Sequence, residues 1–164
     1  LMRVDNDLKP KVIQCDIHGA NGLAFSADQR WMYTSDTPNA VIYRTPLDEQ
    51  GEPGRREVFR RFQPGEGIPD GAAIDVEGCY WSAMFDGWRI ARFSPQGEEL
   101  ETYPMPVRCP TMVCFGGADM KTLYITTTRE NMEDDELAKY PLSGAIFTLP
   151  VAVAGMKKLP FRER

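Results

Sequence analysis

The sequence predicts an all-β fold, a six-bladed β-propeller of which this chain supplies about three and a half four-stranded blades. The first observation behind this is a pattern that recurs at intervals of about 45 residues, the period typical of propeller blades. In each copy a polar residue opens a short apolar strand, a turn follows, and a second strand rich in aromatic or β-branched residues comes next. The second observation is that helical periodicity is almost absent. The three openings are Asn21-Gly22, Asp70-Gly71 and Thr111-Met112.

Strand and turn signals then divide the chain in order. Residues 1–15 have the pattern of the end of a preceding blade, and three blades follow over 21–62, 70–104 and 111–164. The polar segment 48–54 is typical of a turn before an outermost strand, and Pro95 and Gly97 suit a tight hairpin turn. The acidic segment 130–139 predicts one or two helical turns, which Pro141 ends. The outermost strand of the last blade is expected after Gly155.

Composition indicates an ordinary globular chain and excludes several classes of partner. The sequence is 42% hydrophobic and 26% charged, with a net charge of −5. The arginines between 55 and 61 alternate with other residues, as on a solvated strand, so no nucleic-acid partner is expected. The apolar stretch 149–155 contains a proline and is too short to cross a bilayer, so no membrane partner is expected.

The four cysteines form no recognisable metal-binding or disulfide pattern. Cys79 and Cys114 lie in apolar strands and are predicted to be small buried residues. A reducing, cytoplasmic location is therefore expected. The chain begins inside a strand-like run, which leaves open a removed or missing N-terminal segment.

Three and a half blades cannot close a six-bladed ring. Open blade faces would expose sheet edges and apolar side chains to water. We therefore expect a missing N-terminal half, or alternatively a partner chain, to complete the ring.

The blade openings predict a site on the propeller axis. Radial repetition brings equivalent positions together, so Asn21 and Asp70 should converge although 49 residues separate them. An amide oxygen and a carboxylate suit a hard cation such as Ca²⁺ or Mg²⁺, and Zn²⁺ or Mn²⁺ would also accept them. The competing interpretation is that Asn-Gly and Asp-Gly are turn pairs. Thr111 and His18, the only histidine, are weaker candidates for lining the channel and contacting substrate.

An ordered set of motifs resembles the senescence-marker-protein-30/gluconolactonase family of regucalcin-like sugar-lactone lactonases. The resemblance covers nearly the whole chain and corresponds to the C-terminal half of the family's six-bladed propeller. It is carried by Asn21-Gly22-Leu23-Ala24-Phe25-Ser26, Ile68-Pro69-Asp70-Gly71, Ser94-Pro95-Gln96-Gly97, Pro110-Thr111, Phe115-Gly116-Gly117 and Pro141-Leu142-Ser143-Gly144.

The resemblance implies one divalent cation, held by a glutamate, an asparagine and an aspartate. The asparagine corresponds to Asn21 and the aspartate to Asp70, whereas the glutamate belongs to a blade that this chain lacks. The implied activity is metal-dependent opening of an aldonolactone to the sugar acid, with Asp70 as metal ligand and general base. The alternatives are a lactonase or phosphotriesterase acting on a non-sugar substrate, and a calcium-binding propeller without turnover.

Overall fold

The structure is a computed structural model that describes residues 1–5 and 7–157, and it is all-β. A short hairpin of β1 (Met2–Val4) and β2 (Pro10–Val12) comes first. One four-stranded antiparallel sheet contains β3 (Ala20–Phe25), β4 (Trp31–Asp36), β5 (Val41–Pro46) and β6 (Glu57–Arg61). The next contains β7 (Ile68–Ile74), β8 (Tyr80–Phe85), β9 (Arg89–Phe93) and β10 (Glu99–Pro104). The third contains β11 (Pro110–Gly116), β12 (Thr122–Thr127) and β13 (Ile146–Pro150).

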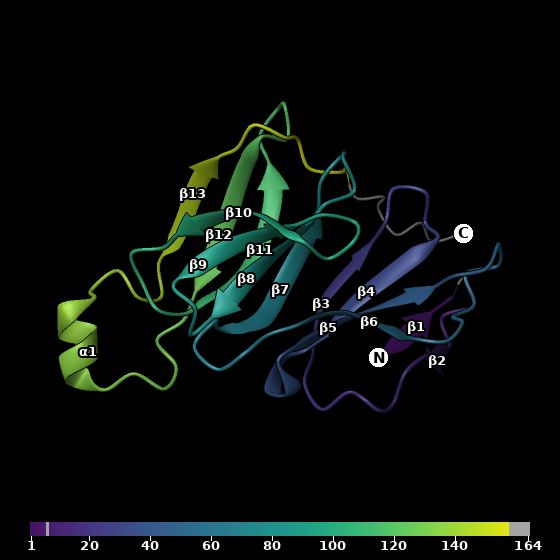
Figure 1. Ribbon diagram of the computed structural model, residues 1–164, viewed down its shortest axis with the longest axis horizontal. Coiled ribbons are helices and arrows are strands. Elements are labelled where there is room, and N and C mark those ends of the chain that lie inside the picture. Colours follow the sequence, from purple (N-terminus) through teal and green to yellow (C-terminus); the bar gives the residue numbers. More distant parts are fainter. Residues whose placement is uncertain (6, 158–164) are drawn as a thin grey trace.

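The sheets follow one another around an arc, as in part of a β-propeller (Figure 1). The strands within each sheet are in chain order, and the inner strand β7 packs against both β3 and β11. A 3-10 turn, η1 (Thr37–Asn39), joins β4 to β5. The predicted helical segment is confirmed as α1 (Asp134–Lys139), which stands off the end of the third sheet (Figure 1). No helix among residues 1–5 and 7–157 combines the length and apolar character that crossing a membrane requires.

The strand predicted after Gly155 falls mostly outside the described residues. The third sheet has three strands within the described part of the chain, and most of the segment after Gly155 lies outside it. Gly155 forms an antiparallel bridge with Asp75, at the end of the neighbouring β7. The Met156 amide donates to the Ile74 carbonyl at 3.1 Å. The chain therefore leaves β13 toward the second sheet, where its backbone hydrogen-bonds to the backbone at the end of β7.

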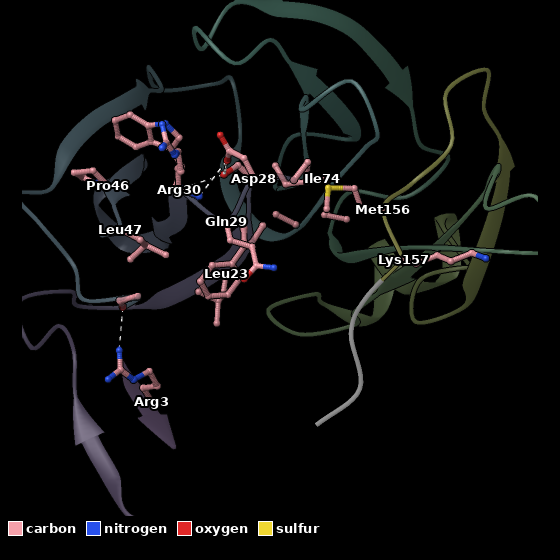
Figure 2. Close-up of a pocket in the computed structure, with 18 of the residues that line it drawn as sticks. Arg3, Leu23, Asp28, Gln29, Arg30, Pro46, Leu47, Ile74, Met156 and Lys157 are labelled. Carbon is pink, nitrogen blue, oxygen red and sulfur yellow. Dashed lines mark hydrogen bonds between the residues drawn. The ribbon is translucent and has the colours of Figure 1, made fainter. Parts of the chain in front are cut away.

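A wide hollow of about 1500 Å³ opens beside the first sheet (Figure 2). Apolar side chains of β3 line it, and Leu23 and Phe25 are 45% and 46% exposed. Cys114 also lines the hollow and is exposed, so the prediction that it is buried was wrong. Burial alternates along this part of β11, where Val113 and Phe115 are buried and Cys114 lies on the exposed face.

We expect the isolated chain to self-associate through this apolar hollow, because large exposed apolar patches drive association. Sedimentation of residues 1–164 should show dimers or larger species. The double substitution of Leu23 and Phe25 by glutamine should shift the distribution toward monomer. The same change at Leu100, an exposed residue of the outer strand β10, is the matched control and should not. A wild-type chain that sediments as a monomer and melts sharply would contradict this expectation.

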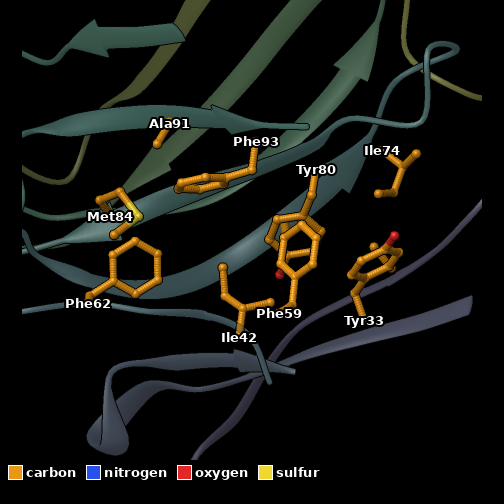
Figure 3. Close-up of a cluster of buried hydrophobic side chains, with 11 residues drawn as sticks. Tyr33, Ile42, Phe59, Phe62, Ile74, Tyr80, Met84, Ala91 and Phe93 are labelled. Atoms are coloured by element: carbon orange, nitrogen blue, oxygen red, sulfur yellow. The ribbon is translucent and has the colours of Figure 1, made fainter. Parts of the chain in front are cut away.

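Aromatic side chains fill the space between the first and second sheets (Figure 3). Tyr33 packs edge-on against Phe59 with ring centroids 5.1 Å apart, and its ring lies 5.4 Å from that of Tyr80. Phe62 makes a similar edge contact with Phe93. Tyr80 and Phe93 are fully buried. Tyr33 and Tyr80 thus pack against one another between the two sheets.

A buried ion pair supports the second sheet. Asp75 is fully buried and accepts hydrogen bonds of 2.9 Å from the Trp81 Nε1 and the Arg92 Nε. Arg92 also pairs with Glu77 and Glu101 at the surface. Asp75 is thus a structural carboxylate that fixes the β7–β8 turn to β9. Both of its carboxylate oxygens accept hydrogen bonds within the second sheet.

Candidate metal centre

The three blade openings occupy equivalent places on the inner strands. Asn21, Asp70 and Thr111 each lie within two residues of the start of β3, β7 and β11. At each place the register with the second strand shifts: between Asn21 and Ala24, between Pro69 and Ala72, and between Pro110 and Met112. Such bulges re-aim side chains at strand ends. The interpretation of Asn21-Gly22 and Asp70-Gly71 as hairpin turn pairs is therefore wrong.

The glycines after the two candidate ligands allow the inner strands to approach closely. Gly22 has a φ of 57°, and a Cβ there would lie 2.5 Å from the Ser35 Oγ and 3.0 Å from the Asp70 carbonyl oxygen. A Cβ on Gly71 would lie 2.6 Å from the Thr111 carbonyl oxygen. Only glycine fits such positions. The backbones at residues 22 and 70, and at residues 71 and 111, are therefore direct neighbours.

Three hydroxyl groups tie the first two openings together. The Ser35 Oγ donates to the Asp70 carbonyl at 3.1 Å, and the Tyr80 hydroxyl donates to the Gly22 carbonyl at 2.8 Å. The Thr37 Oγ1 donates to the Pro69 carbonyl at 2.7 Å and accepts from the Asn21 Nδ2 at 3.0 Å. Sequence reasoning missed these three residues, because each bond joins segments at least 16 residues apart.

The Asp70 carboxylate is half-buried and has no compensating partner within the described residues. Ser35 donates a hydrogen bond to the backbone carbonyl of Asp70. Among the described residues, no hydrogen bond or ion pair is formed by the Asp70 side chain. Burial raises the pKa of Asp70 to about 6, and the negative charge of Glu130 adds to the rise. A carboxylate held in this way gains from a bound cation, which would offset the cost of its charge.

Glu130 belongs to the segment that connects β12 to β13, which sequence reasoning noted only as an acidic excursion. Arg108 holds this segment, since it pairs with Glu136 at 2.6 Å and donates to the Asn131 carbonyl at 2.7 Å. Arg108 also pairs with Asp86 in the β8–β9 turn at 2.7 Å. The third sheet thus contributes a negative charge to the surroundings of Asp70.

The two weaker candidates have other partners. The Thr111 Oγ1 is 2.8 Å from the Thr126 Oγ1 of the paired strand. His18 is exposed, and its Nδ1 lies 2.9 Å from the Asn39 Nδ2. The backbone amides of His18 and Gly19 donate to buried Asp36, which anchors the approach to Asn21. His18 therefore sits on a well-supported segment, although nothing in its contacts gives it a chemical role.

The large hollow lies away from these residues. Its lining includes Phe25, Ile74 and Phe115, at the far ends of the inner strands. Ile74 is labelled in Figure 2. Phe25 is four residues along β3 from Asn21, about 13 Å in an extended strand. The candidate metal centre thus stands at the opposite end of the inner strands, and the hollow is open space beside an uncovered sheet.

Comparison with known proteins bears on the family and the fold of the chain. A model of the SMP-30/Gluconolactonase/LRE-like region matches residues 1–129. A 6-deoxy-6-sulfogluconolactonase from Pseudomonas putida is 54% identical over 156 residues, 94% of this chain and 54% of that protein. The crystal structure of a calcium-binding protein, regucalcin, from Agrobacterium tumefaciens superposes with a TM-score of 0.90 at 31% identity. It covers 94% of this chain and 53% of that one.

A Xanthomonas campestris gluconolactonase superposes with a TM-score of 0.71 at 27% identity, covering 92% of this chain and 44% of that one. The chain therefore spans about half the length of the relatives that it matches.

Proposed function

Because the chain belongs to the SMP-30/gluconolactonase/LRE-like family, we propose that the complete protein hydrolyses a sugar lactone, an aldonolactone, to the free sugar acid. The observation that carries this proposal is the half-buried, uncompensated Asp70 carboxylate beside the Asn21-bearing strand. The names of the Pseudomonas putida and Xanthomonas campestris relatives support a sugar lactone as substrate. A sulfonated gluconolactone is the first substrate to try, given the 54% identity.

The chain's donor groups fit a divalent cation. Asn21 and Asp70 supply an amide oxygen and a carboxylate, which Ca²⁺, Mg²⁺, Mn²⁺ and Zn²⁺ all accept. The Asn21 Nδ2 is engaged by Thr37, which leaves the amide oxygen available. No group of three or more His, Cys, Asp or Glu residues in the described ranges forms a metal cluster. The remaining ligand, a glutamate by family resemblance, belongs to the part of the propeller outside this chain.

The residues of this chain then have distinct tasks in lactone opening. A bound divalent cation would polarise the ester carbonyl and make water more acidic. Asp70 takes the proton from water as the water oxygen bonds to the carbonyl carbon. When the ring C–O bond breaks, Asp70 returns a proton to the leaving ring oxygen. The pKa of Asp70 is raised to about 6 in the metal-free chain, and a bound cation would lower it, which keeps the carboxylate ionised and ready to accept the proton at neutral pH.

A second candidate is cation binding without turnover, which the description of the Agrobacterium tumefaciens structure as calcium-binding favours. The two functions differ in one measurement. The full-length protein should be assayed against a panel of sugar lactones, including the sulfonated one, with and without a chelator. We expect hydrolysis that the chelator abolishes and a divalent cation restores. Cation binding without hydrolysis of any lactone would favour the second candidate, and hydrolysis of non-sugar lactones or phosphotriesters alone would reject the sugar assignment.

Cation affinity should depend on pH through Asp70. The carboxyl must lose its proton to ligate, and its pKa is raised to about 6. The dissociation constant should be flat above about pH 7 and should rise about tenfold per pH unit below about pH 6. Isothermal titration of the metal-free protein with cation, at a series of pH values on both sides of the Asp70 pKa, measures this dissociation constant. An affinity that stays constant down to about pH 5 would show that the Asp70 carboxyl does not bind the cation.

A further inference from the structure

Thr37 hydrogen-bonds both the Asn21 side chain and the backbone next to Asp70. It lies in η1, at the end of β4, and its hydroxyl stands between the Asn21 side chain and the Pro69 backbone. The hydroxyl has a single proton, which it donates to the Pro69 carbonyl at 2.7 Å. It can therefore only accept from Asn21, and the amide must present its NH₂ group to Thr37.

This polarity determines which way the Asn21 amide faces. The oxygen and the nitrogen of a carboxamide are bonded to the same carbon and point in different directions. The hydrogen bond from the Asn21 nitrogen to Thr37 therefore makes the amide oxygen point away from Thr37. Without Thr37, the exposed amide would be free to rotate and to present a nitrogen, which cannot ligate a cation. The bond from Thr37 to the Pro69 carbonyl has a second effect. Because Pro69 immediately precedes Asp70, this bond couples the position of Asp70 to that of Asn21.

We propose that Thr37 is a positioning residue of the metal centre, which holds the Asn21 amide oxygen toward the cation and fixes its place relative to Asp70. This inference rests on the proposed function. Thr37 does not itself contact the cation or the substrate. Its neighbours complete the support, since Ser35 and Tyr80 hold the Asp70 and Gly22 carbonyls in the same way. Those two bonds hold the backbone, whereas the bond from Asn21 to Thr37 is, among residues 1–5 and 7–157, the one that holds a ligand side chain.

The test uses the full-length protein, with Ca²⁺, Zn²⁺, Mg²⁺ and Mn²⁺ as parallel titrants. Thr37→Val keeps the shape and removes the hydroxyl, and it should raise the cation dissociation constant by about 10- to 100-fold, as loss of a ligand's supporting bond does. Thr37→Ser should stay within about twofold of wild type. The matched control is Thr34→Val, three residues away on β4, where the hydroxyl is buried without a partner within the described residues. It should leave affinity unchanged.

Three readouts separate positioning from a purely structural role. Saturating cation should restore much of the turnover of Thr37→Val, because its defect is in cation affinity. In an Asn21→Ala background, Thr37→Val should cost little further affinity, since the side chain that it positions is gone. A structural role alone would lower the melting temperature of the metal-free protein and leave the dissociation constant unchanged well below that temperature. Should Thr37→Val fail to fold, Thr37→Ala is compared with Thr37→Ser in the same titrations.

The outcomes also distinguish the inference from the function on which it rests. If wild type binds cation and Asn21→Ala weakens binding while Thr37→Val and Thr37→Ala do not, the inference is overturned and the proposed function stands. If wild type binds none of Ca²⁺, Zn²⁺, Mg²⁺ and Mn²⁺, both are overturned. Equal losses from Thr37→Val with and without the Asn21 side chain would likewise overturn the positioning role.

Discussion

The Asp70→Asn variant of the full-length protein is expected to lose at least about 100-fold in turnover on its best lactone, the usual contribution of a general base. The substitution nearly preserves shape but removes both the negative charge and the proton acceptor. Cation affinity should fall as well, because a neutral amide replaces the proposed carboxylate ligand of the centre. Turnover is to be measured at saturating cation, so that the loss of the base is seen apart from the loss of affinity.

Two comparisons make this result specific. Asp119→Asn, in the exposed β11–β12 turn at the other end of the inner strands, should leave turnover unchanged. The melting temperature of metal-free Asp70→Asn should equal or exceed that of wild type at neutral pH. A carboxyl whose pKa is raised in the folded state stabilises the fold below its unfolded pKa and loses that contribution as pH rises through about 6. Near-normal hydrolysis by Asp70→Asn would reject Asp70 as base and as essential ligand.

The largest loss of stability is expected from Asp75→Asn, which breaks the buried pair with Arg92. Both side chains are almost fully buried, and the substitution leaves the guanidinium charge without its inner partner. We expect the free energy of unfolding of the full-length protein to fall by about 3–5 kcal/mol, the cost of an uncompensated buried charge. Urea denaturation at neutral pH measures this change.

The surface partner of the same guanidinium is the matched control. Glu101→Gln removes an ion pair of Arg92 whose carboxylate is 42% exposed, and it should cost less than about 1 kcal/mol. Adding Arg92→Met to Asp75→Asn should recover part of the lost stability, because the unpaired charge is then gone. A loss below about 1 kcal/mol for Asp75→Asn would show that water already screens the pair.

Much of the architecture was predictable because it is local and repeated. Each blade opening combines a polar residue, a short apolar run and a turn, so recurrence alone indicated the sheets and their chain order. Boundaries were less predictable. The first blade was expected to begin at residue 21, yet β3 begins at Ala20, since pairing of Ala20 with Asp36 and of Asn21 with Ser35 extends the ladder past the bulge.

Burial depended on what lies opposite each face, which the chain's own pattern does not contain. Cys79 is buried as predicted, whereas Cys114, also predicted to be buried, is exposed because no sheet of the described residues covers its side of β11. The alternation of a strand reports which residues share a face, and only the packing of neighbouring sheets decides whether that face meets protein or water.

By itself, the sequence determined the β architecture, the equivalence of Asn21 and Asp70, and the oxygen chemistry that they could offer a cation. These follow from residue type and period, which are local properties. Only the tertiary structure decided how those groups are held: the hydroxyls of Ser35, Thr37 and Tyr80 and the charge of Glu130 act across segments far apart in the chain. Hydrogen bonds between side chains and the backbones of distant strands produce no periodic pattern in a sequence. Whether a polar residue at a strand end forms such a bond depends on which segments lie beside it in the folded chain.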